Sequence, residues 1–413
     1  MSKPSPWKSL FEKRMLIIFL MGFASGAPFL LTGGVLKIWL AREQVDISVI
    51  GYFSWVGLAY SLKFLWAPLL DRFTLFGTGR RKSWLVIIQA MLILTITWLG
   101  SLEPMVDLKV MAAVAVLVAF FSATQDIAID AYRREICKDE QLGVASALTQ
   151  YGYRISMILS TGVLVSLVGS SVIDLSWHQL YYVMAACMGI GLVTTLLAPE
   201  PEIDPAHIPK TLASAFVDPF REFLTRKGAL LILLFVFLFK LGDALSAAML
   251  SPYYVHIGYS NADIGLIAKT FGLASVMVGL AIGGVIILYL GIYRSLWTFG
   301  ILQALSTASF ALLTFTGAQN WALAFVVVFE DLSAGMGNAA FIAYLGAISN
   351  RRFTATQFAV FSSVAGLGRN FFAGFTGDMV KGLGWPSFFI TCALIAVPGL
   401  LMLLKVRPDA QTK

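Results

Sequence analysis

The residues best able to do chemistry lie inside apolar segments, and the most regular set is QDIAIDAYRR at 125–134. Asp126 and Asp130 are spaced i, i+4, so their carboxylates share one face of a helix. A carboxyl group that is close to another and poorly hydrated can hold a proton at physiological pH. The pattern favours proton coupling, with Asp126 as the deeper residue. The alternative is a structural ion pair with one of three arginines: Arg133, Arg134 or Arg154.

Acidic residues also lie inside apolar segments of the second half of the chain. Lys240 and Asp243 are spaced i, i+3, so they could neutralise each other or open onto a cavity as a switch. Glu330 and Asp331 are neighbours and point about 100° apart on a helix, so only one can face the interior squarely. The sequence does not decide whether Lys240 and Asp243 neutralise each other or open onto a cavity. It also does not decide which of Glu330 and Asp331 faces the interior. The candidate proton-coupling residues are Asp126, Asp130, Asp243 and Glu330.

Two arginines occupy matching places in the two halves of the chain, Arg154 and Arg369. Arginine can hold a carboxylate through two parallel hydrogen bonds. The pair could therefore bind an anionic substrate from both sides. It could equally well neutralise Asp126 and Glu330.

Other polar residues in the apolar segments have a structural interpretation. Lys63 and Lys269 lie where long side chains can reach the membrane surface, and we interpret both as structural. The segment GFASGAP at 22–28 contains a GxxxG spacing, which favours close packing of helices. Ser25, within it, is a candidate cavity hydroxyl.

The composition requires a membrane around these residues. Of 413 residues, 58% are hydrophobic and 13% charged, and the mean hydropathy is +0.81. Soluble domains average about 25% charged residues, whereas a bilayer accepts apolar helices of about 20 residues. The cysteines and histidines are scattered, so we expect neither a disulfide framework nor a metal site.

Hydropathy in a window of about 20 residues predicts an all-α polytopic membrane protein with twelve transmembrane helices. The predicted spans are 15–40, 48–70, 83–101, 108–133, 142–168, 179–198, 228–255, 262–289, 293–316, 320–348, 354–380 and 385–404. Lysine and arginine gather in alternate loops and at both ends, as cytoplasmic segments require. Both termini are therefore expected in the cytoplasm. The net charge of +7 reflects this bias, and no nucleic-acid partner is needed to explain it.

A Pro-rich, charged stretch divides these helices six and six. The predicted domains are an N-terminal six-helix bundle at 1–198, a cytoplasmic linker at 199–227 and a C-terminal six-helix bundle at 228–413. The halves resemble each other, since Gln89-Ala90 recurs as Gln303-Ala304 and Arg154 as Arg369. Both halves begin on the same side of the membrane, so the repeat is parallel. This arrangement is typical of the major facilitator superfamily.

The loop between the second and third spans carries a second resemblance to that superfamily. PLLDR at 68–72, then GRRK at 79–82, is similar to its G-x-L-a-D-R-x-G-R-K-x-x-L signature, with the first glycine replaced and several residues inserted. In the superfamily the aspartate caps a neighbouring helix and the basic residues latch the cytoplasmic side. The resemblance implies a cytoplasmic gating motif of Asp71, Arg72, Gly79, Arg80, Arg81 and Lys82. It also implies a cavity lined by the first, fourth, seventh and tenth spans, which favours a cavity position for Lys240 and Asp243.

Longer stretches resemble the AmpG muropeptide permeases of Gram-negative bacteria, a branch of this superfamily. They include GFASGAPFLLTGG at 22–34, SATQDIAIDAYR at 122–133, YGYRISM at 151–157, FEDLSAGMGNAAFIA at 329–343 and TATQFAVFSSVAGLGR at 354–369. The resemblance spans essentially the whole chain. One departure is that some AmpG proteins have two further C-terminal spans.

The resemblance implies a proton-coupled importer rather than an enzyme. Its substrates would be N-acetylglucosaminyl-1,6-anhydro-N-acetylmuramyl peptides, taken from the periplasm for cell-wall recycling and, in some species, for β-lactamase induction. The protein would act as a monomer in the bacterial inner membrane, with no cofactor besides the proton gradient. A large anionic sugar-peptide needs side chains that bind carboxylates and amides. The candidate substrate-binding residues are Ser25, Gln125, Arg154, Lys240, Asn338, Arg369 and Asn370.

Other functions stay open at this stage. The chain could carry another anionic solute, such as an acyl-CoA or a siderophore, or export its solute. It could instead be a membrane-embedded enzyme, although no reactive His or Cys lies beside an acid in the sequence pattern. It could also be a sensor that binds a ligand without moving it, which a flux measurement would reveal.

Overall fold

The computed structural model describes residues 12–75, 79–137, 142–201, 228–348 and 366–406. Within these ranges the chain is helical, apart from one isolated β-bridge between Val168 and Leu175. Helices are expected here because a bilayer offers no water to backbone N–H and C=O groups, and a helix pairs them internally. The predicted all-α fold is confirmed.

Among the described residues, nine helices are long and apolar enough to cross a membrane. They are Lys13–Arg42, Arg80–Gly100, Leu108–Arg133, Trp177–Leu197, Ala229–Ile257, Asn261–Ile287, Tyr289–Thr316, Asn320–Leu345 and Trp385–Met402. Each corresponds to one predicted span. Of the other three predicted spans, the second overlaps the shorter apolar helix Ile47–Leu62 and the fifth begins with the helix Leu142–Met157. The first part of the eleventh, 354–365, lies outside the described residues, so the count of twelve stays a prediction.

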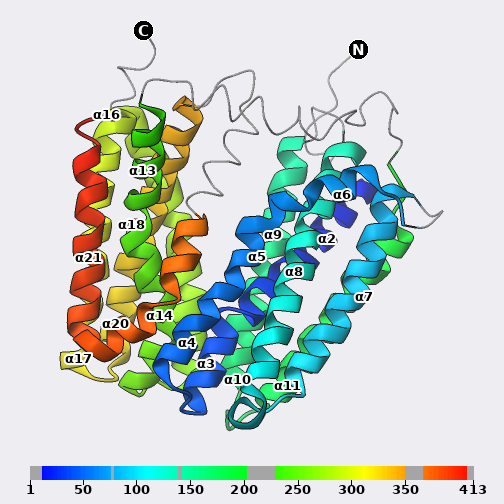
Figure 1. Ribbon diagram of the computed structural model, residues 1–413, viewed down its shortest axis with the longest axis horizontal. Helices are drawn as coiled ribbons and strands as arrows, with labels where there is room; N and C mark the ends of the chain where they lie inside the picture. The colour runs from blue at the N-terminus through cyan, green and yellow to red at the C-terminus, as the bar shows by residue number, and fades with distance from the viewer. Residues whose placement is uncertain (1–11, 76–78, 138–141, 202–227, 349–365, 407–413) are drawn as a thin grey trace. The chain divides into compact units, whose positions relative to one another are not determined.

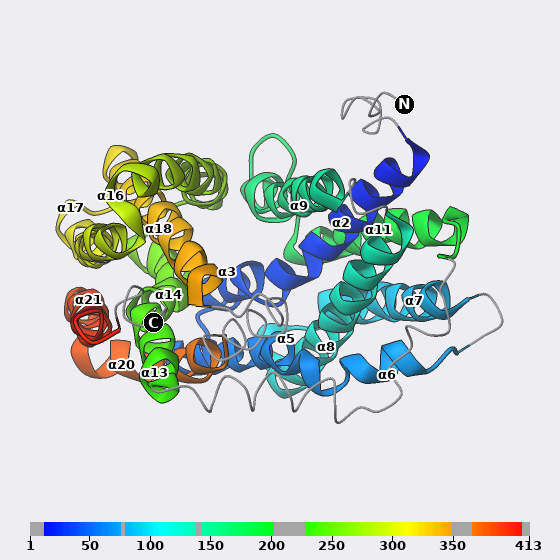
Figure 2. The same ribbon diagram turned by 90° about the horizontal axis from the view of Figure 1, so that it is seen from above.

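The chain forms two compact units, and the first comprises residues 1–43 and 62–212. Its elements are α2 (Lys13–Leu31), α3 (Gly34–Arg42), η2 (Lys63–Leu65), α6 (Ala67–Arg72), α7 (Arg80–Gly100), α8 (Pro104–Ile136), α9 (Leu142–Met157), the π-helix η4 (Ile158–Leu164), α10 (Val165–Leu167) and α11 (Trp177–Leu197). Helix α2 packs against α8, α9 and α11, and α7 packs against α8 and α11 (Figures 1 and 2). The polar residues of α2 and α8 therefore lie inside this unit.

The second unit comprises residues 44–61 and 213–413. Its elements are α4 (Ile47–Tyr52), η1 (Phe53–Gly57), α5 (Leu58–Leu62), α13 (Ala229–Phe239), α14 (Leu241–Ile257), α15 (Asn261–Asp263), the π-helix η6 (Ile264–Phe271), α16 (Gly272–Ser309), η7 (Phe310–Leu312), α17 (Leu313–Thr316), α18 (Asn320–Ile348), α20 (Thr376–Leu383) and α21 (Trp385–Met402). The segment 44–61, which the sequence placed in the bundle 1–198, packs here because α4 contacts α20. Most of the predicted linker 199–227 lies outside the described residues.

The predicted close packing of the GxxxG segment is confirmed in the first unit. Gly22 and Gly26 of α2 face the backbone of Thr149 and Tyr153 of α9. A Cβ atom at either glycine would collide with a carbonyl oxygen of α9. Small residues allow this approach, which membrane helices need because lipid supplies no hydrophobic force between them.

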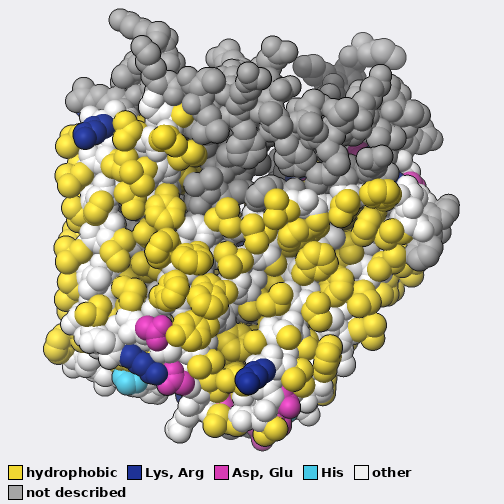
Figure 3. Space-filling view, in the orientation of Figure 1, with side chains coloured by type: hydrophobic (Ala, Val, Ile, Leu, Met, Phe, Trp, Pro, Cys, Tyr) yellow, Lys and Arg dark blue, Asp and Glu magenta, His cyan; other side chains and the backbone are white. Residues whose placement is uncertain are grey.

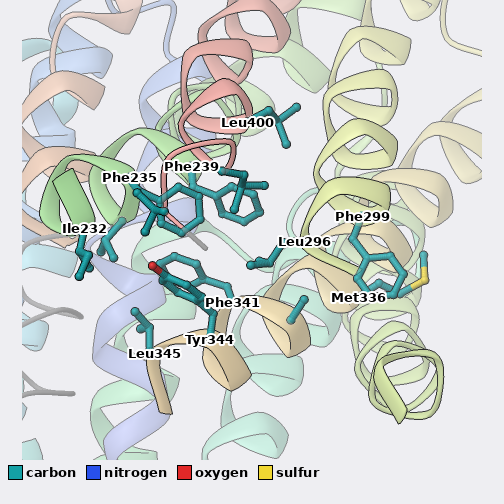
Figure 4. Close-up of a cluster of buried hydrophobic side chains, with 14 of the residues drawn as sticks. Ile232, Phe235, Phe239, Leu296, Phe299, Met336, Phe341, Tyr344, Leu345 and Leu400 are labelled. Atoms are coloured by element: carbon teal, nitrogen blue, oxygen red, sulfur yellow. The ribbon is translucent and has the colours of Figure 1, made fainter. Parts of the chain in front are cut away.

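An aromatic cluster fills the core of the second unit (Figure 4). Phe239 stacks on Phe341 with ring centroids 5.6 Å apart, and Phe235 meets Tyr344 edge-on at 5.1 Å. These contacts join α13 to α18. The visible outer face is largely covered by hydrophobic side chains with few charged ones among them, as contact with lipid requires (Figure 3).

Irregular helical segments occur where charged residues collect. Lys240 has φ −106° and ψ 0°, so it ends α13 and begins α14. Lys269 lies in the π-helix η6. Short π-helical segments are rare and are frequently found at functional sites, which directs attention to Lys269.

Candidate functional site

Asp126 is the central polar residue of the first unit. Its carboxylate accepts a hydrogen bond from the hydroxyl of Ser25, which joins α8 to α2. The cation acting on it, among the described residues, is Lys63 of η2 rather than Arg154. The Asp126 side chain is half-buried, so it retains some accessible surface. The prediction that Lys63 is merely structural therefore gives way to a position beside the candidate coupling residue.

Asp130 lies in a different environment from Asp126 despite the shared helix face. Its side chain is 58% exposed and forms a 3.0 Å ion pair with Arg133 one turn away. This is the structural pairing that the sequence left open. Exposed pairs of this kind contribute little to stability. The two carboxylates of this helix face therefore differ in burial and in partner.

Two further candidates lie near Asp126 in the first unit. Gln125 is fully buried and its amide nitrogen donates to the backbone oxygen of Ala24, 3.1 Å away. Gln125 thus forms a second contact between α8 and α2. Arg154 is half-buried on α9 next to Tyr153, whose ring lies within electrostatic range of Asp126. Arg154 is therefore near the site but does not pair with Asp126.

In the second unit, the Lys240 side chain forms hydrogen bonds with two other side chains. Its ammonium donates to Asp243 at 3.3 Å and to the amide oxygen of Gln303 at 3.1 Å. The Lys240 side chain is 13% exposed. The sequence favoured a cavity position for this pair. The structure shows mutual neutralisation, with a cavity opening beside Asp243 and bordered also by Gln303, Thr307 and Cys392.

The structure separates Glu330 from Asp331, which the sequence could not do. Glu330 is 5% exposed and accepts hydrogen bonds from Ser306 at 2.6 Å and Thr307 at 3.1 Å, both on α16. It also contacts the carboxyl of Asp243. Asp331 is half-buried and interacts with Lys269 of η6 instead. Glu330 therefore bonds with α16 and Asp243, whereas the cation that acts on Asp331 is Lys269; Asp243 lies within electrostatic range of both carboxyl groups.

Lys269 is the residue that sequence reasoning placed least well. It was expected to reach the membrane surface, but its ammonium donates to the hydroxyl of Ser251 on α14, 3.1 Å away. It also interacts with Asp331 on α18. A lysine directly inside an apolar segment was the available signal, since charges inside spans usually face a partner or a cavity.

The two units build the same combination of groups from helices of the same rank. Serine, lysine and aspartate come from the first, second and fourth predicted span of each half of the chain: Ser25, Lys63 and Asp126, then Ser251, Lys269 and Asp331. Asp126 lies in the last third of α8, whereas Asp331 lies in the first half of α18. The two groups therefore lie at different heights along the helices of their own units.

The remaining substrate-binding candidates differ in their exposure and in the hydrogen bonds that they form within the protein. The amide nitrogen of Asn370 donates to the Gly57 oxygen at 2.8 Å and to Ser61 at 3.0 Å. This amide holds the segment 44–61 in the second unit. Arg369 is exposed and lies within electrostatic range of Asp243. Asn338 is half-buried on α18.

The basic end of the gating motif is ordered by two glutamates. Arg80 and Arg81 both pair with Glu135 of α8, at 2.9 and 2.6 Å. Glu200 accepts hydrogen bonds from the backbone N–H groups of Arg81 and Lys82, so it caps the start of α7. Sequence reasoning missed this cap.

Two further residues of the gating motif, Lys82 and Gly79, lie at the same end of α7. Lys82 donates to the carbonyl oxygens of Leu196 and Ala198, where α11 ends. Gly79 has φ +109°, a conformation that favours glycine. The side chains of Asp71 and Arg72 lie outside the described residues, so their predicted roles stay predictions.

Apolar spans with charged groups buried among them define an integral membrane protein. Residues 14–330 match the family model described as Major Facilitator Superfamily. The chain belongs to that superfamily and, within it, to the AmpG-like transporters.

The relatives cover nearly the whole chain. It is 41% identical over 397 residues to the anhydromuropeptide permease of Escherichia coli (strain K12), which covers 96% of this chain and 80% of that protein. Putative transporter AmpG 4 of Rickettsia felis is 32% identical over 95% of this chain and 96% of its own. The solved structure of a bacterial homologue of the human lysosomal transporter Spinster gives a TM-score of 0.77 at 14% identity, over 98% of this chain and 97% of that one. The last likeness concerns the fold alone.

Proposed function

We propose that this protein imports anhydro-muropeptides across the bacterial inner membrane by proton symport, as a secondary active transporter. The observation that carries the coupling is Asp126, a half-buried carboxyl group inside a span, held by Ser25 and facing Lys63. The identity of 41% with an anhydromuropeptide permease supports the class of substrate. The imported fragments would supply cell-wall recycling.

Lys63 gives the coupling a physical basis. While Asp126 is ionised, its charge balances that of Lys63. Once Asp126 takes up a proton, Lys63 is left as an uncompensated charge inside a span, which costs roughly 2.5–3.5 kcal/mol on insertion scales. An anionic group of the substrate removes that cost. Proton and substrate therefore bind together more favourably than either binds alone.

The substrate-binding candidates fall into two roles in this proposal. Arg154, Arg369 and Asn338 keep accessible surface and would contact the sugar-peptide directly. Gln125, Lys240 and Asn370 form hydrogen bonds with neighbouring segments of their own units and would keep these segments in position. Asp243 and Glu330 would form a second protonatable group in the second unit.

The topology that accompanies this function has both termini in the cytoplasm, as the distribution of lysine and arginine favours. Substrate would enter from the opposite, periplasmic side. The protein would work as a monomer, and the proton gradient would replace any bound cofactor.

Uptake into proteoliposomes tests the proposal. A labelled anhydro-muropeptide is offered with an inward proton gradient, without one, and with a protonophore. Accumulation above the external concentration is expected only with the gradient, and the protonophore should abolish it. Gradient-independent accumulation, or none from a folded protein, would contradict the proposal.

A further inference from the structure

Lys269 and Asp331 lie within electrostatic range of each other in the second unit, and both have unused hydrogen-bonding capacity. The Lys269 ammonium has three N–H donors, and its hydrogen bond in the structure goes to Ser251 at 3.1 Å. Asp331 has no hydrogen bond or ion pair with any residue that the structure describes, although it lies within electrostatic range of Lys269. Both side chains are half-buried and keep accessible surface.

The Lys240–Asp243 pair of the same unit is a direct ion pair and serves as a comparison. Lys240 and Asp243 are in contact at 3.3 Å, and Gln303 takes up a further donor. Lys269 and Asp331 do not come within the 4.0 Å of an ion pair among the described residues. Partly desolvated charges held apart lose hydration without gaining a full contact. A ligand that reached both would recover that loss.

Closely packed helices surround Lys269 and Asp331. Helix α16 packs along α18, and the π-helix η6 directly precedes α16 (Figures 1 and 2). Gly272, the first residue of α16, lies against Asp331, so that a Cβ atom there would collide with its carboxylate. Tyr254 of α14 is 2% exposed and lies within electrostatic range of Asp331. Lys269 and Asp331 therefore lie among closely packed helices.

The charges of the two residues restrict the ligand. A simple anion drawn to Lys269 would meet the carboxylate of Asp331, and a simple cation drawn to Asp331 would meet the ammonium of Lys269. A group that carries a carboxylate and an ammonium close together satisfies both residues at once. Such a group could pair with both residues, which do not form a direct ion pair with each other among the described residues.

We propose that Lys269 and Asp331 bind a zwitterionic amino-acid group of the transported molecule. The carboxylate of this group pairs with Lys269 and its ammonium with Asp331. The assignment rests on the proposed function, because the peptide portion of a muropeptide is the part that can carry such a group. In the proposed orientation, the site lies in the half of α18 nearer the periplasm, where substrate arrives.

Ligand chemistry tests the assignment in the intact protein. Binding is measured for an anhydro-muropeptide whose peptide ends with a free ammonium and a free carboxylate, for its N-acetylated form and for its carboxamide. Each modification removes one charge and leaves the sugars unchanged. Each is expected to weaken binding by about tenfold or more, the usual scale for a hydrogen bond to a charged group.

Two variants assign each charge to its partner. Lys269→Gln should remove the preference for carboxylate over carboxamide and keep the preference for free over acetylated ammonium. Asp331→Asn should do the reverse. Lys381→Ala, at an exposed lysine 49% accessible, is the matched control and should keep both preferences.

The outcomes separate this inference from the proposed function. Equal binding of the three compounds by the wild-type protein would overturn the zwitterion site and leave muropeptide transport standing. So would variants that weaken all three compounds equally, since this indicates a structural role. Failure of the folded wild-type protein to bind any of them would contradict the proposed function, and this site with it.

Discussion

The hydroxyl of Ser25 on α2 donates a hydrogen bond to the carboxylate of Asp126 on α8. This contact joins the first and fourth spans of the first unit at a half-buried acid that faces Lys63. A carboxylate that loses its charge also loses much of the strength of such a bond, because charge-assisted hydrogen bonds are about twice as strong as neutral ones. Proton uptake at Asp126 would therefore weaken the contact between the two helices as well as release Lys63.

Asp126→Asn should abolish accumulation and spare exchange. Asparagine imitates the protonated acid, so bound substrate can still cross, but no proton is taken up or released. Uptake driven by a proton gradient should fall to the equilibrium level, whereas exchange of internal for external labelled substrate should continue. Asp130→Asn is the control, because Asp130 is exposed and paired with Arg133, and we expect this variant to accumulate substrate normally. Normal accumulation by the Asp126 variant would disprove the assignment.

Lys63→Gln should weaken substrate binding more than it weakens the fold. The variant removes the cation that balances Asp126 in one state and the substrate in the other. We expect KM for uptake to rise about tenfold or more, the usual scale for a bond to a charged group. Lys381→Ala, at an exposed site, serves as the comparison. An unchanged KM would remove Lys63 from the mechanism.

Glu330 should tolerate loss of its charge better than loss of its oxygens. Glu330→Gln keeps an acceptor for Ser306 and Thr307, whereas Glu330→Ala leaves the Thr307 hydroxyl buried without its acceptor. An orphaned buried group costs about 1–3 kcal/mol, so Tm should fall clearly for the alanine variant only. Thermal unfolding in detergent measures both. A glutamine variant as unstable as the alanine variant would show that the negative charge itself is required.

Gly22→Ala should disrupt the first unit. The added Cβ atom would meet the backbone of Thr149 on α9, and overpacking typically costs about 1–3 kcal/mol. Gly189→Ala on α11 is the control, since nothing lies within 4 Å of a Cβ atom there. The yield of folded protein in size-exclusion chromatography and its Tm should fall for the first variant and hold for the second. Equal behaviour would show that α2 can move away from α9.

Acid should remove the small contribution of one ion pair outside the spans. Lys381 donates to Asp46 at 2.5 Å and holds the pKa of that carboxyl below its ordinary value of 3.8. The pair therefore contributes stability above pH 3.8 and loses it as the pH falls through the lowered pKa. Both groups are about half exposed, so Lys381→Ala should cost at most about 1 kcal/mol at neutral pH. Unfolding of both proteins between pH 3 and 7 measures the difference, and a difference that grows with acid would contradict this account.

Much of the fold could be predicted because membrane constraints act on local sequence. An apolar run of the right length must become a helix, whatever it packs against. The GxxxG segment likewise foretold close packing, and the predicted partnership between α2 and another helix was confirmed at Gly22. The segment 44–61 could not be assigned in this way, because its grouping with the second unit depends on contacts of α4 with α20.

The candidate site was predicted less completely, for a physical reason. Helical spacing shows that Asp126 and Asp130 share a face, but it cannot show that one is buried beside Lys63 while the other pairs with Arg133. Those partners come from different helices. Lys269 was misplaced for the same reason, since its π-helical segment and its contact with Ser251 leave no regular pattern in the sequence.

In the proposed mechanism, each substrate molecule enters together with protons, and Asp126 is the residue that binds the coupled proton. The most direct test loads a pH-sensitive dye into proteoliposomes at equal internal and external pH, then adds anhydro-muropeptide outside. Wild-type protein should acidify the interior as substrate enters, Asp130→Asn should do the same, and Asp126→Asn should leave the internal pH unchanged. Substrate entry into wild-type vesicles without acidification, or acidification by the Asp126 variant, would contradict the account.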